Sequence, residues 1–217
     1  MNTAIIVAAG SGTRFGSEIP KQFLEIHGKP VVGYAIDRFS ESELIDEIVL
    51  VVSASEVARF EGKYPKVVRV VAGGKTRAAS VRNGLDVISI ETGIVAVHDG
   101  ARPLVSLKEI EAVVNAAVED GAACLVGCVT DTIKEYHQGV VTGTLDRRTL
   151  RRALTPQAFR AEILHEAFAA VEPDESVTDE CSLVERLGHE ITAVQGSPRN
   201  IKITHPDDLK IAELFLR

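Results

Sequence analysis

Cysteine is scarce in this chain of 217 residues, and its scarcity excludes a disulfide-stabilised scaffold. The three cysteines, Cys124, Cys128 and Cys181, are odd in number and sparse, and too few ligands surround them for a structural zinc site. Cys124 and Cys128 fall in the apolar run AACLVGCVT. We therefore expect these two, and Cys181 on a helix, to be buried thiols of a protein from the reducing cytoplasm.

Long hydrophobic runs and excess positive charge are also missing. No stretch approaches the ~20 apolar residues of a membrane-spanning helix. The short apolar run at the N-terminus lacks the basic residues of a secretory signal. Lys and Arg number 24 against 31 Asp and Glu, which gives a net charge of -7. We therefore expect no membrane or nucleic-acid partner, and an anionic ligand would need a local basic cluster.

Motifs of covalent and histidine-metal catalysis are absent from the sequence. It contains no G-x-S-x-G and no H-E-x-x-H, and its six histidines are scattered. Cys181 near His189 resembles a thiol dyad only superficially, because a helical core cysteine explains it better. The sequence therefore favours chemistry that needs no enzyme nucleophile.

Short apolar runs alternate with helical patterns along the chain, whose apolar content of 45% can fill a sizeable core. We expect strands at 4–9, 47–52, 67–72, 94–98 and 124–129. Helical spacing recurs over 78–88 and after Ser106, whose Glu109 completes a capping box. A last helix begins after His205-Pro206. The alternation predicts one α/β domain over 1–217 with a mostly parallel central sheet.

Residues 130–150 interrupt this alternation. Polar and apolar residues alternate there on both sides of His137-Gln138-Gly139, which is typical of a β-hairpin. The segment is too polar for the central core. We expect a protruding arm that covers the site or embraces a second subunit.

Three glycine-containing segments follow expected strands, at the sheet edge where α/β proteins bind ligands. The first, residues 8–16, precedes Pro20-Lys21-Gln22-Phe23, and its glycines allow backbone amides to approach phosphate. A dinucleotide fingerprint would need glycine where Phe15 stands. Phosphate binding, supported by Arg14 and Lys21, and a plain tight turn both remain open.

The second and third segments are 73–80 and 98–103. Gly74-Lys75-Thr76 suggests a Walker A loop, but Arg69 occupies the position of its first glycine, so that reading fails. An anion site at the helix start and an ordinary turn remain. In His98-Asp99-Gly100-Ala101-Arg102-Pro103, the acid could hold a metal–phosphate complex or form a structural Asp–Arg pair.

Other polar fragments are individually typical of caps, turns or solvated faces. They are Asp131-Thr132, Asp146-Arg147, Thr155-Pro156-Gln157, Thr178-Asp179-Glu180 and 200–204. The four arginines at 147, 148, 151 and 152 read as a solvated helical surface.

Together these motifs form one ordered set from Ala8 to Leu209. They are A-A-G-S-G-T-R-F-G with P-K-Q-F, G-G-K-T-R-A-A-S-V, H-D-G-A-R-P, L-T-P-Q, T-D-E and N-I-K-I-T-x-P-D-D-L. The set resembles the 2-C-methyl-D-erythritol 4-phosphate cytidylyltransferases of the non-mevalonate isoprenoid pathway. The resemblance implies a Rossmann-like nucleotidyltransferase domain, a homodimer built through the arm, and the substrates CTP and methylerythritol 4-phosphate. It further implies that Mg²⁺ assists, with Asp99 as the candidate metal contact.

The resemblance also implies roles for individual residues. Catalytic roles fall on Arg14, Lys21, Arg147 and Lys202. CTP contacts fall on Ala8, Ala9, Gly10, Ser11, Gly12, Thr13, Gly74, Arg77, Ser80, Asp99, Gly100, Ala101 and Arg102. Substrate contacts fall on Thr132, Arg147, Thr155, Thr178 and Lys202, with Thr132 and Arg147 supplied by the partner subunit. Lys75 and Arg199 stand where some relatives carry an acid.

Four alternatives remain at this point. A ribitol-5-phosphate cytidylyltransferase is the nearest, although Gly100-Ala101 favours the methylerythritol enzymes, since the ribitol enzymes tend to carry serine there. A sugar-1-phosphate nucleotidyltransferase using UTP or GTP is the second. A non-catalytic nucleotide-binding module is disfavoured by the presence of both Arg14 and Lys21, and a dehydrogenase by Phe15.

Overall fold

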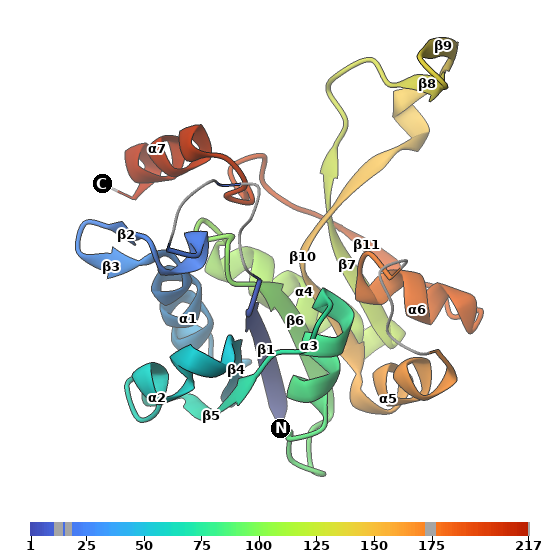
Figure 1. The fold of residues 1–217 in the computed structure, drawn as a ribbon. Coiled ribbons are helices and arrows are strands. Elements are labelled where there is room, and N and C mark those ends of the chain that lie inside the picture. Colours follow the sequence, from blue (N-terminus) through green and yellow to red (C-terminus); the bar gives the residue numbers. More distant parts are fainter. Residues whose placement is uncertain (11–14, 16–18, 172–176, 217) are drawn as a thin grey trace.

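The structure is a computed structural model that describes residues 1–10, 15, 19–171 and 177–216. The predictions for Ser11, Gly12, Thr13 and Arg14 lie outside the described residues. A seven-stranded sheet forms the centre (Figure 1). Its strand order is β11 (Thr192–Gln195), β7 (Ala122–Cys128), β10 (Arg151–Arg160), β6 (Ile94–Asp99), β1 (Asn2–Ala8), β4 (Glu47–Val52) and β5 (Val67–Ala72).

The sheet is mostly parallel, as predicted. The pairs β1–β4, β1–β6, β4–β5 and β7–β11 are parallel, whereas β10 runs antiparallel to both β6 and β7. The five expected strands are confirmed as β1, β4, β5, β6 and β7, while β10 and β11 were missed. In β10, the pairing with β7 is irregular. Its register shifts between Ala153 and Gln157, around Pro156, because proline cannot donate a ladder hydrogen bond.

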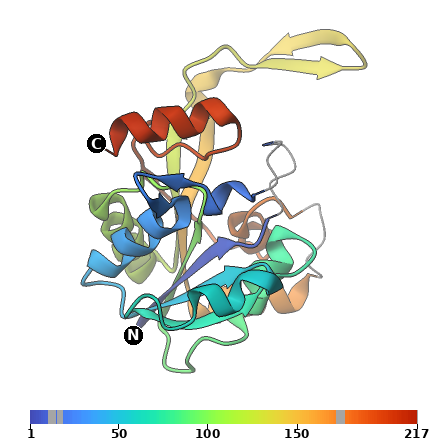
Figure 2. The ribbon, with the colours of Figure 1, turned by 60° about the vertical axis from the view of Figure 1, so that its left-hand side comes forward.

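Helices cover both faces of the sheet (Figures 1 and 2). Alternate residues of β4 enter two separate cores: Ile48 and Leu50 belong to one, and Val49 and Val51 to the other. The first core contains α1 (Val31–Glu41) and α4 (Leu107–Asp120). The second contains α3 (Arg77–Leu85), α5 (Ala161–Ala170) and α6 (Glu180–Arg186). This two-sided burial explains the continuous apolar runs of the inner strands.

Short elements complete the body of the molecule. They are η2 (Lys21–Phe23), β2 (Glu25–Ile26), β3 (Lys29–Pro30), η3 (Ala54–Glu56) and α2 (Val57–Phe60), while η4 (Arg147–Thr149) lies just before β10, in the segment 130–150 predicted to form the arm. The C-terminal helix α7 (Pro206–Phe215) begins where predicted, with Asp207 and Asp208 in its first turn. Ala212 of α7 packs with Val31 and Ile203 in a third, smaller core.

The predicted hairpin forms from β8 (Lys134–His137) and β9 (Val140–Thr144) and projects from the body as an arm (Figures 1 and 2). Gln138 and Gly139 connect the strands with φ angles of 47° and 89°. Positive φ at both residues is typical of the two-residue turn that matches strand twist. The hairpin pairs only with itself among the described elements, so its outer surface is solvent-exposed.

Two sequence expectations were wrong. Cys128 is exposed, whereas Cys124 and Cys181 are buried as expected, because β7 leaves the covered part of the sheet at its end. The four arginines do not share a helical surface, since Arg147 and Arg148 lie in η4 and Arg151 and Arg152 in β10.

β5 is an edge strand and is largely exposed. No helix in the described part of the chain is long and apolar enough to cross a membrane.

Candidate active site

A cavity of about 480 Å³ opens at the carboxyl ends of β1, β5 and β6, the edge that the sequence predicts. Described residues from all three glycine-containing segments line it. They are Val7, Ala8, Ala9, Gly10, Lys21, Gln22, Gly74, Lys75, Thr76, Arg77, Ser80, Asp99, Ala101 and Lys202. The structure thus brings Lys21, Arg77, Asp99 and Lys202 to one place, as the motifs imply.

Gln22 fixes the chain where it leaves β1. Its buried amide Nε2 donates to the carbonyls of Ala8 (2.8 Å) and Gly10 (2.7 Å). Lys21, its neighbour in η2, lines the cavity. Sequence reasoning missed this role of Gln22, whose only signal was its place in P-K-Q-F.

The turn from β5 into α3 is built from side chain–backbone hydrogen bonds. Thr76 caps α3 by accepting from the Ala79 amide (3.0 Å). The Ser80 hydroxyl donates to the Thr76 carbonyl (2.9 Å) and accepts from the Gly74 amide (3.1 Å). A Cβ at Gly73 would lie 2.2 Å from that of Ala9, so glycine lets this turn pack against the end of β1. Ser80 therefore shapes the wall of the cavity.

Asp99 ends β6 inside a ring of three cations. Its carboxylate accepts from Arg77 Nε (2.9 Å) and Lys202 Nζ (2.8 Å), and Arg102 Nε lies at 3.5 Å. Burial alone would raise the pKa of Asp99, but Arg77, Lys202 and Arg102 hold this pKa well below its usual value. Asp99 is therefore ionised at neutral pH, and the Asp–Arg pair, one of the two possibilities that H-D-G-A-R-P left open, is present.

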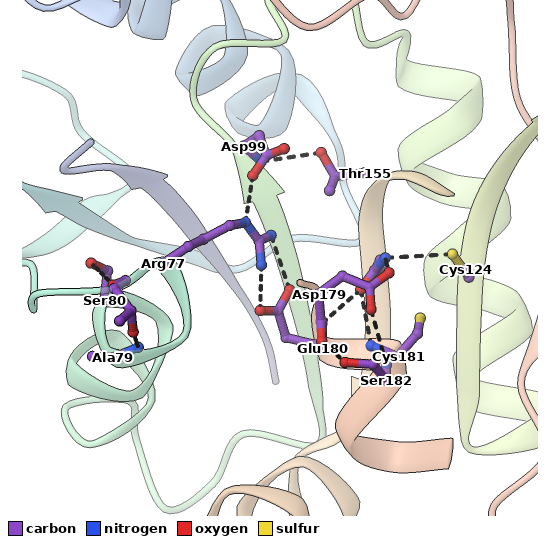
Figure 3. Close-up of polar contacts among 12 residues, drawn as sticks. Arg77, Ala79, Ser80, Asp99, Cys124, Thr155, Asp179, Glu180, Cys181 and Ser182 are labelled. Atoms are coloured by element: carbon purple, nitrogen blue, oxygen red, sulfur yellow. Dashed lines mark hydrogen bonds and ion pairs between the residues drawn. The ribbon is translucent and has the colours of Figure 1, made fainter. Parts of the chain in front are cut away.

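Glu180, the first residue of α6, is a partner of Arg77 that sequence reasoning missed. The Arg77 guanidinium donates to both of its carboxylate oxygens, at 2.6 and 3.0 Å (Figure 3). Burial raises the pKa of Glu180, and the charge of Arg77 opposes that rise. Burial lowers the pKa of Arg77, but Glu180 and Asp99 reverse this and raise it overall. T-D-E pointed to this segment without indicating the pairing.

A second cavity, of about 200 Å³, shares Arg77, Asp99 and Lys202 with the first. Its other lining residues are Arg102, Ala153, Leu154, Thr155, Gln157, Thr178 and Asp179. The structure therefore brings together Thr155, Thr178 and Lys202, three of the residues matched to substrate contacts. The shared residues form a wall between the two cavities.

Thr155 is oriented by the buried imidazole of His98. His98 Nε2 lies 3.2 Å from the Arg102 carbonyl and so donates to it, because a carbonyl can only accept. Burial lowers the pKa of His98 to about 4, so its neutral Nδ1 accepts from the Thr155 hydroxyl at 3.0 Å. The same hydroxyl oxygen accepts from the Asp99 amide at 3.1 Å. Toward a ligand, Thr155 is therefore an acceptor.

The Gly100–Arg102 turn joins the loop before α7. The Gly100 amide donates to Val7 O (2.8 Å), and the Ile203 amide donates to Ala101 O (2.9 Å). Arg102 donates through a terminal nitrogen to Asn200 O (2.9 Å). These contacts bring Lys202 of N-I-K-I-T to Asp99.

Lys75 and Arg199, which stand where some relatives carry an acid, lie in different places. Lys75 lines the larger cavity, while Arg199 stacks on Phe215 and lines neither of the two cavities.

Thr132 and Arg147 line neither cavity. Both are exposed on the arm, and Arg147 donates to the Thr130 carbonyl. Within a single chain, the structure does not bring these two predicted substrate contacts to the site.

Asp99 is the only carboxylate that lines the larger cavity among the described residues. The residues that the structure describes contain no group of three or more His, Cys, Asp or Glu side chains that could hold a metal ion. One ionised carboxylate in the lining fits Mg²⁺, which usually takes one or two protein carboxylates together with substrate phosphates. It does not suit a metal held by protein alone.

Comparisons with known proteins point to a single family. The sequence model of the family described as 2-C-methyl-D-erythritol 4-phosphate cytidylyltransferase matches residues 2–217. A relative with that name from Syntrophus aciditrophicus is 46% identical over 222 residues, covering 99% of this chain and 95% of its own. The solved 4-diphosphocytidyl-2C-methyl-D-erythritol synthase of Anaerococcus prevotii has 30% identity and a TM-score of 0.85, covering 100% of this chain and 98% of its own. The solved cytidylyltransferase of Thermus thermophilus has 31% identity and a TM-score of 0.78, covering 99% and 98%.

Proposed function

The chain belongs to the 2-C-methyl-D-erythritol 4-phosphate cytidylyltransferase family, and on this basis we propose how its residues carry out the reaction. The protein is a nucleotidyltransferase of the non-mevalonate isoprenoid pathway. It joins CTP and methylerythritol 4-phosphate to give 4-diphosphocytidyl-2-C-methyl-D-erythritol and pyrophosphate. The names of its relatives do not favour the ribitol-5-phosphate alternative.

The two adjoining cavities carry the proposal for the site. The larger takes CTP and the smaller takes methylerythritol 4-phosphate, so that the acceptor phosphate meets the α-phosphorus at the shared wall. An acceptor phosphate oxygen attacks in line, the bond from the α-phosphorus to the bridging oxygen breaks, and pyrophosphate leaves with that electron pair. No enzyme nucleophile takes part, so positioning and charge neutralisation supply the catalysis.

The CTP side comprises the first two glycine-containing segments and the tip of β6. Lys21, which lines the larger cavity, and Arg14 stabilise charge that develops on the α-phosphoryl and leaving oxygens. The other CTP contacts are Ala8, Ala9, Gly10, Ser11, Gly12, Thr13, Gly74, Arg77, Ser80, Asp99, Gly100, Ala101 and Arg102. The lining of the larger cavity supports eight of these contacts: Ala8, Ala9, Gly10, Gly74, Arg77, Ser80, Asp99 and Ala101.

The acceptor side joins residues of two subunits. Thr178 and Lys202 of one chain hold the acceptor, and Thr155 accepts a hydrogen bond from one of its hydroxyls. Thr132 and Arg147 reach this cavity from the arm of the partner in a homodimer. Their exposure on an arm, outside both cavities of their own chain, supports this arrangement.

We assign Mg²⁺ as the metal, with Asp99 as its protein contact, directly or through water. Bound among the phosphates, the ion would neutralise their negative charge and keep most of its own water. Lys202 and Arg77, which pair with Asp99, keep the carboxylate ionised for this contact. We also place the enzyme in the cytoplasm, in line with its sparse, unpaired cysteines.

Pyrophosphate release from CTP and Mg²⁺, measured with methylerythritol 4-phosphate or ribitol 5-phosphate as acceptor, tests the activity. Release with the first alone is expected. Release with ribitol 5-phosphate alone would contradict the assignment of the acceptor. In the same assay with UTP or GTP in place of CTP, faster turnover would contradict the assignment of CTP as the nucleotide substrate.

A Lys21→Ala substitution tests the catalytic role of that side chain. We expect turnover to fall on the order of 10²–10³-fold, as for removal of other preorganised donors. Lys210→Ala is the matched control, since Lys210 is exposed on α7, where it pairs with Asp207 at 2.9 Å, and lines neither cavity. Unchanged turnover in Lys21→Ala would contradict the role.

A further inference from the structure

Arg77 links three segments that are far apart in the sequence. It starts α3, its Nε donates to Asp99 at the tip of β6, and its two terminal nitrogens donate to Glu180 at the start of α6 (Figure 3). Three N–H groups of a rigid, planar guanidinium are thus directed at protein carboxylates. The plane of Arg77, and the side from which it meets Asp99, depend on Glu180.

Glu180 is itself held firmly. Its side chain is fully buried, and Gln157 Oε1 accepts from the amides of Glu180 and Cys181, each at 3.2 Å. The Gln157 side-chain nitrogen donates to Asp179 (2.9 Å), which caps α6 through the Ser182 amide (3.0 Å). The start of α6 is therefore fixed to β10, and the Glu180 carboxylate has little freedom to move away from Arg77.

The positive charge of Arg77 is opposed by negative charge of the protein itself. Arg77 faces two carboxylates, Glu180 and Asp99, so most of its positive charge is offset within the protein. Such an arginine contributes less to neutralising a triphosphate than to fixing its neighbours. Without the charge of Glu180, Arg77 could turn both terminal nitrogens toward Asp99 or toward a bound phosphate, and the carboxylate of Asp99 would change its orientation.

We infer that Glu180 is a positioning residue for the reaction: it holds Arg77, and through Arg77 it sets the orientation of Asp99 in the wall between the two cavities. It lines neither cavity. The inference rests on the proposed function of that wall and adds a residue for which the motifs gave no role.

Glu180→Gln tests the inference, because glutamine keeps the size and removes the charge and one acceptor. We expect kcat/KM for CTP to fall about 10–100-fold, the range seen when the supporting partner of a site residue is lost. Glu180→Asp, which keeps the charge with a shorter reach, should recover part of the loss. Glu185→Gln is the matched control, since Glu185 is exposed on the same helix, and should behave as wild type.

A double-mutant cycle with Arg77→Lys separates positioning from a general structural role. Lysine keeps the charge but cannot make the two-pronged contact. If Glu180 acts through Arg77, Glu180→Gln should add less than about threefold to the defect of Arg77→Lys, because neighbouring sites are non-additive. Equal losses in both backgrounds would overturn the inference, as would wild-type kinetics in Glu180→Gln.

Failure of a variant to fold and failure of the proposed function can both be told apart from failure of the positioning role. If Glu180→Gln does not fold, Glu180→Asp is assayed instead, and wild-type kinetics in that variant would overturn the inference. If the wild-type enzyme itself releases no pyrophosphate from CTP and methylerythritol 4-phosphate, the proposed function fails. An active wild type with an unaffected Glu180→Gln variant contradicts only the positioning role.

Discussion

His98 is a fully buried histidine with all of its hydrogen-bonding positions used by the fold. Its Nε2 donates to Arg102 O, its Nδ1 accepts from Thr155, and its ring lies 4.9 Å from that of Phe39. Burial, the largest influence, lowers its pKa from 6.5 to about 4. A neutral imidazole at this place keeps the Thr155 hydroxyl oriented in the smaller cavity.

The same residue makes stability depend on pH. Below pH 6.5 the unfolded chain protonates His98 while the folded chain does not, so the free energy of unfolding falls as pH decreases toward about 4. The contribution over that interval is roughly 3 kcal/mol. The free energy of unfolding, measured with urea at several pH values between 7 and 4.5, should fall less steeply with decreasing pH in His98→Asn than in wild type. An equal dependence on pH in both proteins would contradict the prediction, and His165→Asn, at an exposed position, is the control.

Arg147 and Arg148 allow a comparison of two neighbouring arginines. Arg148 pairs with Asp146 on the arm (2.7 Å), and we give it no role in the site. Arg147→Ala should raise the KM for methylerythritol 4-phosphate and lower kcat, because a cation that holds the acceptor phosphate is lost. CTP binding in a calorimetric titration should change little, and Arg148→Ala should match wild type. Loss of CTP binding in Arg147→Ala would argue against the role.

The residues of the site were partly predictable. Glycines, Lys21, Asp99 and Arg102 follow apolar strand runs, so position in the sequence pointed to them directly. The contact between Arg77 and Glu180 spans 103 residues, and no local pattern encodes which distant acid a buried arginine will meet. The same holds for the Gln22 amide, whose partners are backbone carbonyls.

Among the elements, the turn between β5 and α3 requires a residue without a side chain at Gly73. Alanine at Gly73 would place a Cβ 2.2 Å from that of Ala9 and 2.8 Å from Ser80 Oγ. Gly73→Ala should therefore cost about 1–3 kcal/mol of stability, as overpacking does. A Cβ at Gly10 meets nothing within 4 Å, so Gly10→Ala should unfold like wild type.

Activity should rank these two variants differently from stability. The open space at Gly10 belongs to the larger cavity, so Gly10→Ala should weaken CTP binding without loss of stability. Thermal unfolding and a CTP titration measure the two properties separately. If Gly73→Ala were as stable as wild type, the close approach of this turn to β1 would not be required.

Inner strands were easier to predict than edge and antiparallel strands. β1, β4 and β6 are buried on both sides, and their apolar runs reveal them. β10 begins with two exposed arginines and contains Pro156, so its sequence looked like a loop followed by a turn. Its burial depends on β6 and β7, which lie on either side of it, and this context is tertiary.

On the scale of the whole molecule, the arm is the part that a single chain leaves without a packing partner among the described residues. Tyr136, Val140, Val141 and Leu145 are exposed on it. Apolar side chains on a thin hairpin are typical of a surface that another subunit covers. We expect the protein to sediment as a dimer, and Val140→Asp with Val141→Asp to shift it toward monomer and reduce activity. A monomeric, fully active wild type would contradict the shared site.

Mixing two impaired variants tests whether the arm completes the partner's site. A heterodimer of Lys21→Ala and Arg147→Ala chains contains one complete site, because the intact Arg147 and the intact Lys21 meet there. Random exchange of subunits should restore about a quarter of wild-type activity, since half of the dimers are mixed and half of their sites complete. No recovery despite exchange would show that Arg147 acts within its own chain.

The common wall of Arg77, Asp99 and Lys202 also has a thermodynamic consequence for the order of events. In the proposed arrangement, CTP and the acceptor share this wall and do not bind independently, because the first to arrive changes the charges and orientations that the second encounters. Linkage makes this effect reciprocal: any factor by which CTP strengthens binding of the acceptor is the factor by which the acceptor strengthens binding of CTP. An inhibitor that displaces Lys202 from Asp99 in one cavity would thereby alter the affinity of the other.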